Sequence, residues 1–152
     1  MATSGKASTN KSTFGRETSV STIIQASPEI VWKLLTTASD IPRWNSTIVS
    51  LEGDIKQGET IKLKSTLDEK RTFNLTIKEL EPHKRLVWGD NQGNRTYTLL
   101  ESGKDTVFTM TEKIGGLLFP MYGRFIPPFD DAFEQFAADL KKEAESMQAS
   151  HV

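Results

Sequence analysis

The fold of this chain is decided by the stretch Ala26-Ser27-Pro28-Glu29-Ile30-Val31-Trp32-Lys33-Leu34-Leu35-Thr36-Thr37-Ala38-Ser39-Asp40-Ile41-Pro42-Arg43-Trp44-Asn45. Ser27 can cap the free amides of a helix whose first residue is Pro28, and Glu29 places a carboxylate in the first turn, where the helix dipole favours it. Four apolar residues then recur at helical spacing: Ile30, Val31, Leu34 and Leu35. The stretch therefore predicts a capped amphipathic helix, followed by a second short helical turn at about residues 39–44.

Short segments of alternating apolar and polar residues surround this helix. In residues 60–67, for example, Ile61 and Leu63 alternate with Lys62 and Lys64, which predicts a strand with one buried face. Polar turns separate the segments, as an antiparallel meander requires. The predicted strands cover residues 18–25, 48–54, 60–67, 72–78, 85–89, 96–101 and 106–114.

The last part of the chain predicts a long helix that starts near Pro128. Acidic residues follow that start and lysines come later, which suits the helix dipole. One apolar stripe runs along the helix: Phe129, Phe133, Phe136 and Leu140. A long terminal helix with such a stripe needs a sheet face to pack against.

This order of elements, from residue 18 to residue 147, resembles the START-related helix-grip superfamily, in particular its polyketide cyclase/dehydrase and lipid-transport branch. The segments that carry the resemblance are Ala26-Ser27-Pro28-Glu29-Ile30-Val31-Trp32, Arg43-Trp44-Asn45, Glu81-Pro82-His83-Lys84-Arg85-Leu86-Val87-Trp88 and Leu140-Lys141-Lys142-Glu143-Ala144-Glu145. The resemblance implies an α+β helix-grip fold: a curved antiparallel sheet of about seven strands wrapped around a long C-terminal helix, with two short helices after the first strand. The superfamily includes lipid carriers, hormone receptors, aromatases, cyclases and activators of a chaperone ATPase.

Length and composition set the limits of this fold. The chain has 152 residues, enough for a single domain, which we place at residues 18–148 between a disordered N-terminal tail (1–17) and a C-terminal tail (149–152). Its 19 basic and 20 acidic residues form no basic footprint, so we expect no nucleic-acid partner. Cysteine is absent, and no apolar run is long enough for stable membrane insertion. We expect a soluble cytoplasmic protein without a cofactor.

The interior of such a fold is either a packed core or a cavity for a hydrophobic ligand, and the sequence leaves both alternatives open. If the resemblance holds, the cavity is lined by the apolar residues that the alternation points inward. We predict the following ligand-binding residues: Leu63, Phe73, Leu75, Trp88, Tyr97, Leu99, Phe108, Met110, Met121, Phe125, Phe129 and Phe133.

Residues 117–128 form an apolar segment that Pro120, Gly123, Pro127 and Pro128 interrupt, so we do not expect one regular helix. Beside a pocket mouth, the segment could gate the pocket or make a transient contact with a membrane or a protein. The alternative is that it extends the last helix and covers the edge of the sheet.

Candidate catalytic groups are few. His83 and His151 are placed as surface residues, and no His and carboxylate cluster predicts a metal site. Arg95, Tyr97 and Glu112 share the parity of the inward positions, so they are the only acid–base set to nominate. The alternative is that the charged residues lie at strand ends and extend their heads into water.

Three functions follow. The first is binding or transport of a hydrophobic small molecule that is lipid-, sterol- or polyketide-like. The second is a polyketide cyclase or dehydratase that uses the same pocket, although the shortage of histidine argues against it. The third is a protein-binding module like the chaperone ATPase activators, which would need an exposed patch instead of a deep cavity.

Overall fold

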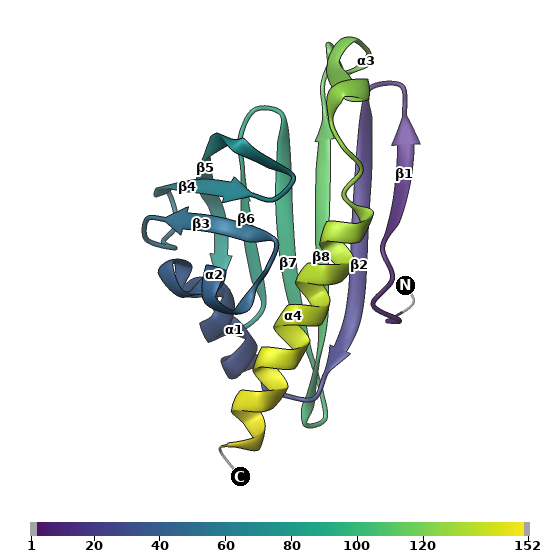
Figure 1. The fold of residues 1–152 in the computed structure, drawn as a ribbon. Helices are drawn as coiled ribbons and strands as arrows, with labels where there is room; N and C mark the ends of the chain where they lie inside the picture. The colour runs from purple at the N-terminus through teal and green to yellow at the C-terminus, as the bar shows by residue number, and fades with distance from the viewer. Residues whose placement is uncertain (1–2, 151–152) are drawn as a thin grey trace.

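A computed structural model describes residues 3–150; the outermost residues of both predicted tails, and with them His151, lie outside the described range. One face of an open antiparallel sheet is crossed by a long C-terminal helix, as Figure 1 shows. The elements are β1 (Ser8–Ser12), β2 (Gly15–Ile24), α1 (Pro28–Thr36), η1 (Ala38–Asp40), α2 (Ile41–Trp44), β3 (Ile48–Glu52), β4 (Thr60–Ser65), β5 (Asp68–Glu81), β6 (Arg85–Gly89), β7 (Gly93–Ser102), β8 (Asp105–Gly115), α3 (Phe119–Tyr122), η2 (Gly123–Phe125) and α4 (Asp130–Ala149). The predicted α+β helix-grip class is confirmed.

The sheet has eight strands in the order β1-β2-β8-β7-β6-β5-β4-β3. Seven of them match the predicted strands, and β1 is the addition. The sequence predicts a disordered segment over residues 1–17, whereas the structure pairs Ser8–Ser12 with β2 and begins β2 at Gly15. Hydrogen bonds hold β1 in place, because Thr9 Oγ1 donates to Asp130 at 2.7 Å and the Ala7 amide donates to Glu134 at 2.9 Å. A polar strand held in this way has no hydrophobic alternation to reveal it.

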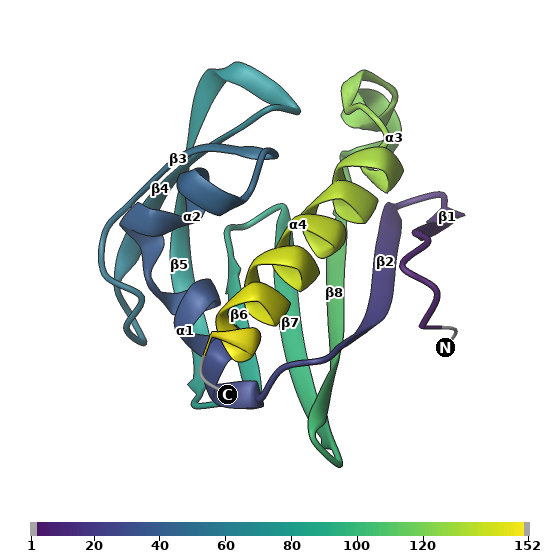
Figure 2. The same cartoon turned by 60° about the horizontal axis from the view of Figure 1, so that its bottom comes forward.

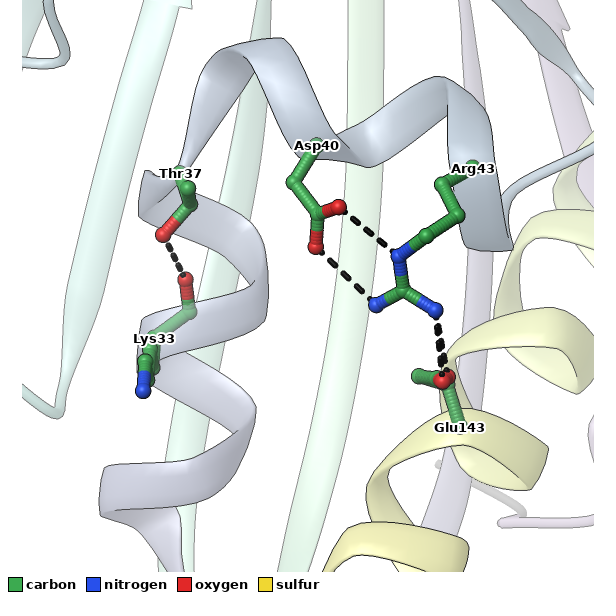
Figure 3. Close-up of polar contacts among 5 residues, drawn as sticks. All are labelled: Lys33, Thr37, Asp40, Arg43 and Glu143. Atoms are coloured by element: carbon green, nitrogen blue, oxygen red, sulfur yellow. Dashed lines mark hydrogen bonds and ion pairs between the residues drawn. The ribbon is translucent and has the colours of Figure 1, made fainter.

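The stretch at residues 26–45 forms α1, η1 and α2. Ser27 caps α1, with its hydroxyl accepting from the Ile30 amide at 3.4 Å. Beyond η1, the Arg43 guanidinium binds both carboxylate oxygens of Asp40, at 2.7 and 3.0 Å, and reaches Glu143 on α4 at 3.1 Å (Figure 3). The cluster ties α2 to the terminal helix from the solvent side.

The next two residues tie α2 to the same helix from inside. Trp44 meets the Phe136 ring edge-on, with 6.0 Å between the ring centroids. Asn45 is buried; its amide donates to the Phe136 carbonyl at 3.3 Å, and its side-chain oxygen accepts from the Thr47 amide. The Arg43-Trp44-Asn45 signature is therefore a helix-docking element.

The core lies between α4 and the middle of the sheet. The rings of Tyr97, Phe108 and Phe136 stack on one another, with centroids 5.6 to 6.3 Å apart. All four residues of the predicted apolar stripe, Phe129, Phe133, Phe136 and Leu140, are buried in this core cluster. Figure 2 shows α4 running over the strands with α1 and α2 beside it. Within residues 3–150, none of the helices has both the length and the hydropathy that crossing a bilayer requires.

Candidate ligand-binding site

A cavity of about 400 Å³ lies at the end of the sheet where α4 begins. Strands β4 to β8 form its floor and sides, and the chain between α3 and α4 forms its cover; Figure 2 shows α3 and the β4–β5 turn at this end of the molecule. Apolar side chains from both parts line it: Leu63, Phe73, Leu75, Trp88, Phe125 and Phe129. The cavity thus has the largely apolar wall that a hydrophobic ligand needs.

The cover takes its shape from the prolines and glycine that the sequence places in residues 117–128. Pro120 opens α3, and Gly123 follows it, where a Cβ would come within 2.7 Å of the Phe119 ring. The segment therefore forms α3 and η2 instead of one regular helix, and the sequence predicts that no single regular helix forms here. Arg16 on β2 then fixes the chain that follows, donating to the carbonyls of Ile126 at 3.2 Å and Pro127 at 2.7 Å.

An ion pair lies in the floor of the cavity. Arg95 on β7 and Glu112 on β8 are directly opposite each other, and Arg95 Nε donates to Glu112 Oε1 at 2.7 Å. The Arg95 side chain is 9% exposed and lies over the Phe133 ring, 5.1 Å from its centroid. Burial opposes the positive charge, but the neighbouring Glu112 carboxylate outweighs burial and raises the pKa of Arg95. The opposite charges of the two side chains compensate each other in the floor of the cavity.

Tyr97 lies beside this pair, two residues along β7. Its hydroxyl is buried and makes no hydrogen bond of good geometry within residues 3–150, although the Arg95 guanidinium is close enough to act on it through its charge. Burial raises the pKa of Tyr97, more than Arg95 lowers it. The hydroxyl therefore keeps its proton, and it lies behind the cavity wall.

The twelve predicted ligand-binding residues divide into three groups. Half of them line the cavity: Leu63, Phe73, Leu75, Trp88, Phe125 and Phe129. Five are buried in the packed core: Tyr97, Leu99, Phe108, Met110 and Phe133. Met121 differs from the expectation, because it lies on the outer side of α3 and is 70% exposed. The sequence left a packed core and a ligand cavity as alternatives. The structure has both, at different positions along the same strands.

Sequence reasoning missed part of the cavity wall. Leu67 lines the cavity; it belongs to the predicted strand at residues 60–67 but is not among the predicted ligand-binding residues. Arg16, which holds the cover, falls in the segment predicted to be disordered, where no periodicity marks it. Arg71, which shares the inward parity, lies at the rim with its guanidinium 4.4 Å from the centroid of Phe73. His83 is exposed in its turn. Among residues 3–150, no group of His, Cys, Asp and Glu side chains is arranged to hold a metal ion.

Solved structures with the same architecture are numerous. A conserved protein of unknown function from Enterococcus faecalis superposes with a TM-score of 0.69 at 14% identity, covering 95% of this chain and 80% of that one. A START superfamily protein from Mycobacterium smegmatis superposes with a TM-score of 0.63 at 12% sequence identity, and the match covers 86% of this chain and 98% of that one. A putative protein of the dynemicin biosynthetic locus superposes with a TM-score of 0.66 at 17% sequence identity, and the match covers 87% of this chain and 48% of that one. At these identities the likeness concerns the fold, which is the START-like helix-grip fold.

The sequence itself matches one protein-family model. The match spans residues 25–145, from the cap of α1 to the last turns of α4, and the model is described as Activator of Hsp90 ATPase homolog 1-like protein. No curated protein matches the sequence. The matched region holds the helix-docking element, the ion pair and all six predicted residues that line the cavity. The chain therefore belongs to the family of Activator of Hsp90 ATPase homolog 1-like proteins.

Proposed function

We propose that this chain binds a hydrophobic small molecule of a lipid-, sterol- or polyketide-like kind. The observation that carries the proposal is the cavity of about 400 Å³, because ligand sites in proteins occupy about 300 to 1,000 Å³ and have mostly apolar walls. Each Å² of apolar ligand surface removed from water contributes about 25 cal/mol. The end of the fold that contains the cavity thus offers space and a driving force for ligand binding, which the packed core under α4 does not.

The polar floor limits the chemistry of the ligand. Arg95 and Glu112 neutralise each other, so a charged ligand group at the floor would find no free counter-ion in this pair. The bond from Arg95 Nε to Glu112 Oε1 involves neither terminal nitrogen of the guanidinium and only one of the two carboxylate oxygens. A neutral carbonyl or hydroxyl group would suit these remaining positions, so we expect a mainly apolar ligand with one such end.

Native mass spectrometry of the protein after exposure to a lipid-rich extract tests the proposal. We expect a bound compound at near-stoichiometric amount. The Leu67→Trp variant adds bulk inside the cavity wall and should lose most of that compound, whereas Leu100→Trp adds the same bulk on an exposed position of β7 and should keep it. An unliganded mass across a panel of lipids and polyketides would refute the proposal.

The polar end has its own test. In the Glu112→Gln variant, the amide oxygen can still accept from Arg95, but the cavity gains one uncompensated positive charge. We expect the variant to shift its preference from a long-chain alcohol toward a fatty acid of the same length. An unchanged preference would show that Arg95 does not face the polar end of the ligand, while leaving hydrophobic binding itself intact.

A cyclase or dehydratase is the second candidate, because Arg95 and Glu112 line the cavity and Tyr97 lies behind them. Glu112, which accepts a hydrogen bond from Arg95, would act as the base. Under this candidate, Arg95→Ala and Glu112→Ala lower turnover of a polyketide substrate, while Leu100→Ala does not. Retained ligand binding without turnover in the wild-type protein would exclude it.

The family match favours a third candidate, a protein-binding module that stimulates a chaperone ATPase. This candidate predicts faster ATP hydrolysis by a purified Hsp90 when the chain is added. The rate would depend on exposed residues and not on the cavity, so Leu67→Trp should leave it unchanged. An unaltered ATPase rate at saturating concentrations of the chain would set this candidate aside.

A further inference from the structure

Five large apolar side chains gather at the end of the molecule where the cavity opens. Phe14 comes from the β1–β2 turn and the others from the chain after β8; all are between 55% and 86% exposed. We call this set the apolar tip: Phe14, Leu117, Leu118, Met121 and Phe125. In Figure 1, α3 stands at the far end of the molecule, next to the β1–β2 turn. Exposed apolar side chains are common singly, but a cluster of this kind marks an interaction surface.

Backbone contacts hold the two parts of the tip together. The Gly116 amide donates to the Phe14 carbonyl at 2.9 Å, and Gly15 pairs with Gly115 at the end of the ladder. A Cβ on Gly115 would lie 2.3 Å from the Phe14 oxygen, so this close approach requires glycine. The tip is thus a fixed arrangement of the fold.

The two segments that form the tip carry positive charges and no negative ones, whereas Asp68 and Asp90 lie on neighbouring turns at the cavity. Residues 3–16 and residues 113–129 contain no Asp or Glu, and they contribute exposed Lys11, Lys113 and Arg124. Arg124 stacks on the tip itself, with its guanidinium 4.9 Å from the centroid of the Phe125 ring. The nearest acid along β2, Glu17, is 3.7 Å from the Lys113 ammonium. Apolar side chains flanked by cations are complementary to anionic lipid headgroups above an acyl layer.

We propose that the apolar tip docks on an anionic lipid surface. The five side chains enter the headgroup region while Lys11, Lys113 and Arg124 lie against the phosphates. Phe125 belongs both to the tip and to the cavity wall, so docking brings the mouth of the cavity to the bilayer. This inference goes beyond ligand binding, since it concerns where the protein exchanges a ligand, and it stands on exposure and charge alone.

Sedimentation with vesicles tests it. We expect the full chain to bind vesicles of phosphatidylcholine mixed with phosphatidylserine, and to bind pure phosphatidylcholine vesicles at least tenfold more weakly. A Leu117→Gln/Leu118→Gln/Met121→Gln variant should lose about tenfold or more in binding, because it removes apolar surface from the tip. The matched control is Leu100→Gln, which changes an equally exposed leucine on β7 and should bind like the wild type.

A second variant keeps the apolar side chains and removes the charge. Lys113→Gln/Arg124→Gln should weaken binding to the anionic vesicles by about fivefold per cation, with little change on neutral ones. The thermal midpoint of each variant verifies that the fold is intact. The proposal is overturned if neither vesicle binds, if the tip variants bind as well as Leu100→Gln, or if the tip variant instead abolishes a dimer or the stimulation of Hsp90.

Discussion

The interior between the sheet and α4 has a filled half and an open half, built from the same strands. Along β8, the inward positions Phe108 and Met110 are packed in the core, whereas Glu112 and Ile114 line the cavity. The change coincides with the start of α4. Where the helix covers the sheet, its aromatic side chains fill the space; where the bent chain before it is the cover, the space stays open. Strand alternation therefore decides which side chains face inward, and the covering element decides whether they meet a partner.

Truncation of a ring in each half gives the largest contrast. Phe136→Ala removes a buried ring that contacts Tyr97, Phe108 and Trp44, and we expect it to lower the free energy of unfolding by about 3 to 5 kcal/mol. Phe125→Ala, at the open half, removes a side chain that is 72% exposed and should change the free energy of unfolding by less than about 0.5 kcal/mol. Denaturant unfolding followed by circular dichroism measures both. Equal losses would mean that the open half is packed in solution.

The ion pair at the boundary of the two halves gives the next effect. Glu112→Ala leaves the Arg95 charge buried without its partner, which we expect to cost about 3 kcal/mol, at the low end for buried pairs because the cavity admits water. The double variant Arg95→Met/Glu112→Leu removes both charges and should unfold near the wild-type midpoint. If the double variant is as unstable as the single one, packing and not charge explains the loss.

The two halves also differ in how well the sequence predicts them. The helix cap at Ser27, the strand meander and the stripe on α4 follow from local patterns, because each depends on the spacing of neighbouring residues. The cavity does not, because its depth depends on the cover at residues 122–129 and on Arg16, more than a hundred residues away in the sequence. The alternation along their strands predicts that Arg95 and Glu112 point inward. Their pairing required the β7–β8 register, which no single segment encodes.

The Tyr97 hydroxyl gives a smaller effect of opposite sign. A buried hydroxyl without a good hydrogen bond lowers stability, so Tyr97→Phe should leave the free energy of unfolding unchanged or raise it by up to about 1 kcal/mol. The Tyr97 ring keeps its contacts with Trp88 and Phe108 in this variant. Denaturant midpoints again measure the effect. A loss above about 1 kcal/mol would show that the hydroxyl has a partner in solution, such as a water molecule or the guanidinium of Arg95.

The smallest effect concerns the exposed ion cluster of Asp40, Arg43 and Glu143, which is the surface counterpart of the buried Arg95–Glu112 pair. The hydrogen bond from Arg43 lowers the pKa of Asp40, although partial burial opposes it. A lowered folded-state pKa stabilises the protein above the unfolded-state value, near pH 3.9 for Asp, and this contribution is lost as the pH falls through the lower folded-state value. Arg43→Ala should therefore lower the thermal midpoint slightly at pH 7 and hardly at all once Asp40 is protonated.

The pH dependence separates this cluster from a simple packing contact. Lys84→Ala breaks another exposed pair, with Glu81 at 3.8 Å, whose members do not join two helices, and serves as the matched control. If the Arg43→Ala midpoint differs from the wild type by the same amount at pH 7 and at acid pH, Arg43 contributes through its aliphatic chain on α2 and not through Asp40. Added salt should shrink the difference at pH 7, because the cluster is exposed, whereas the Arg95–Glu112 pair in its apolar surroundings should respond far less.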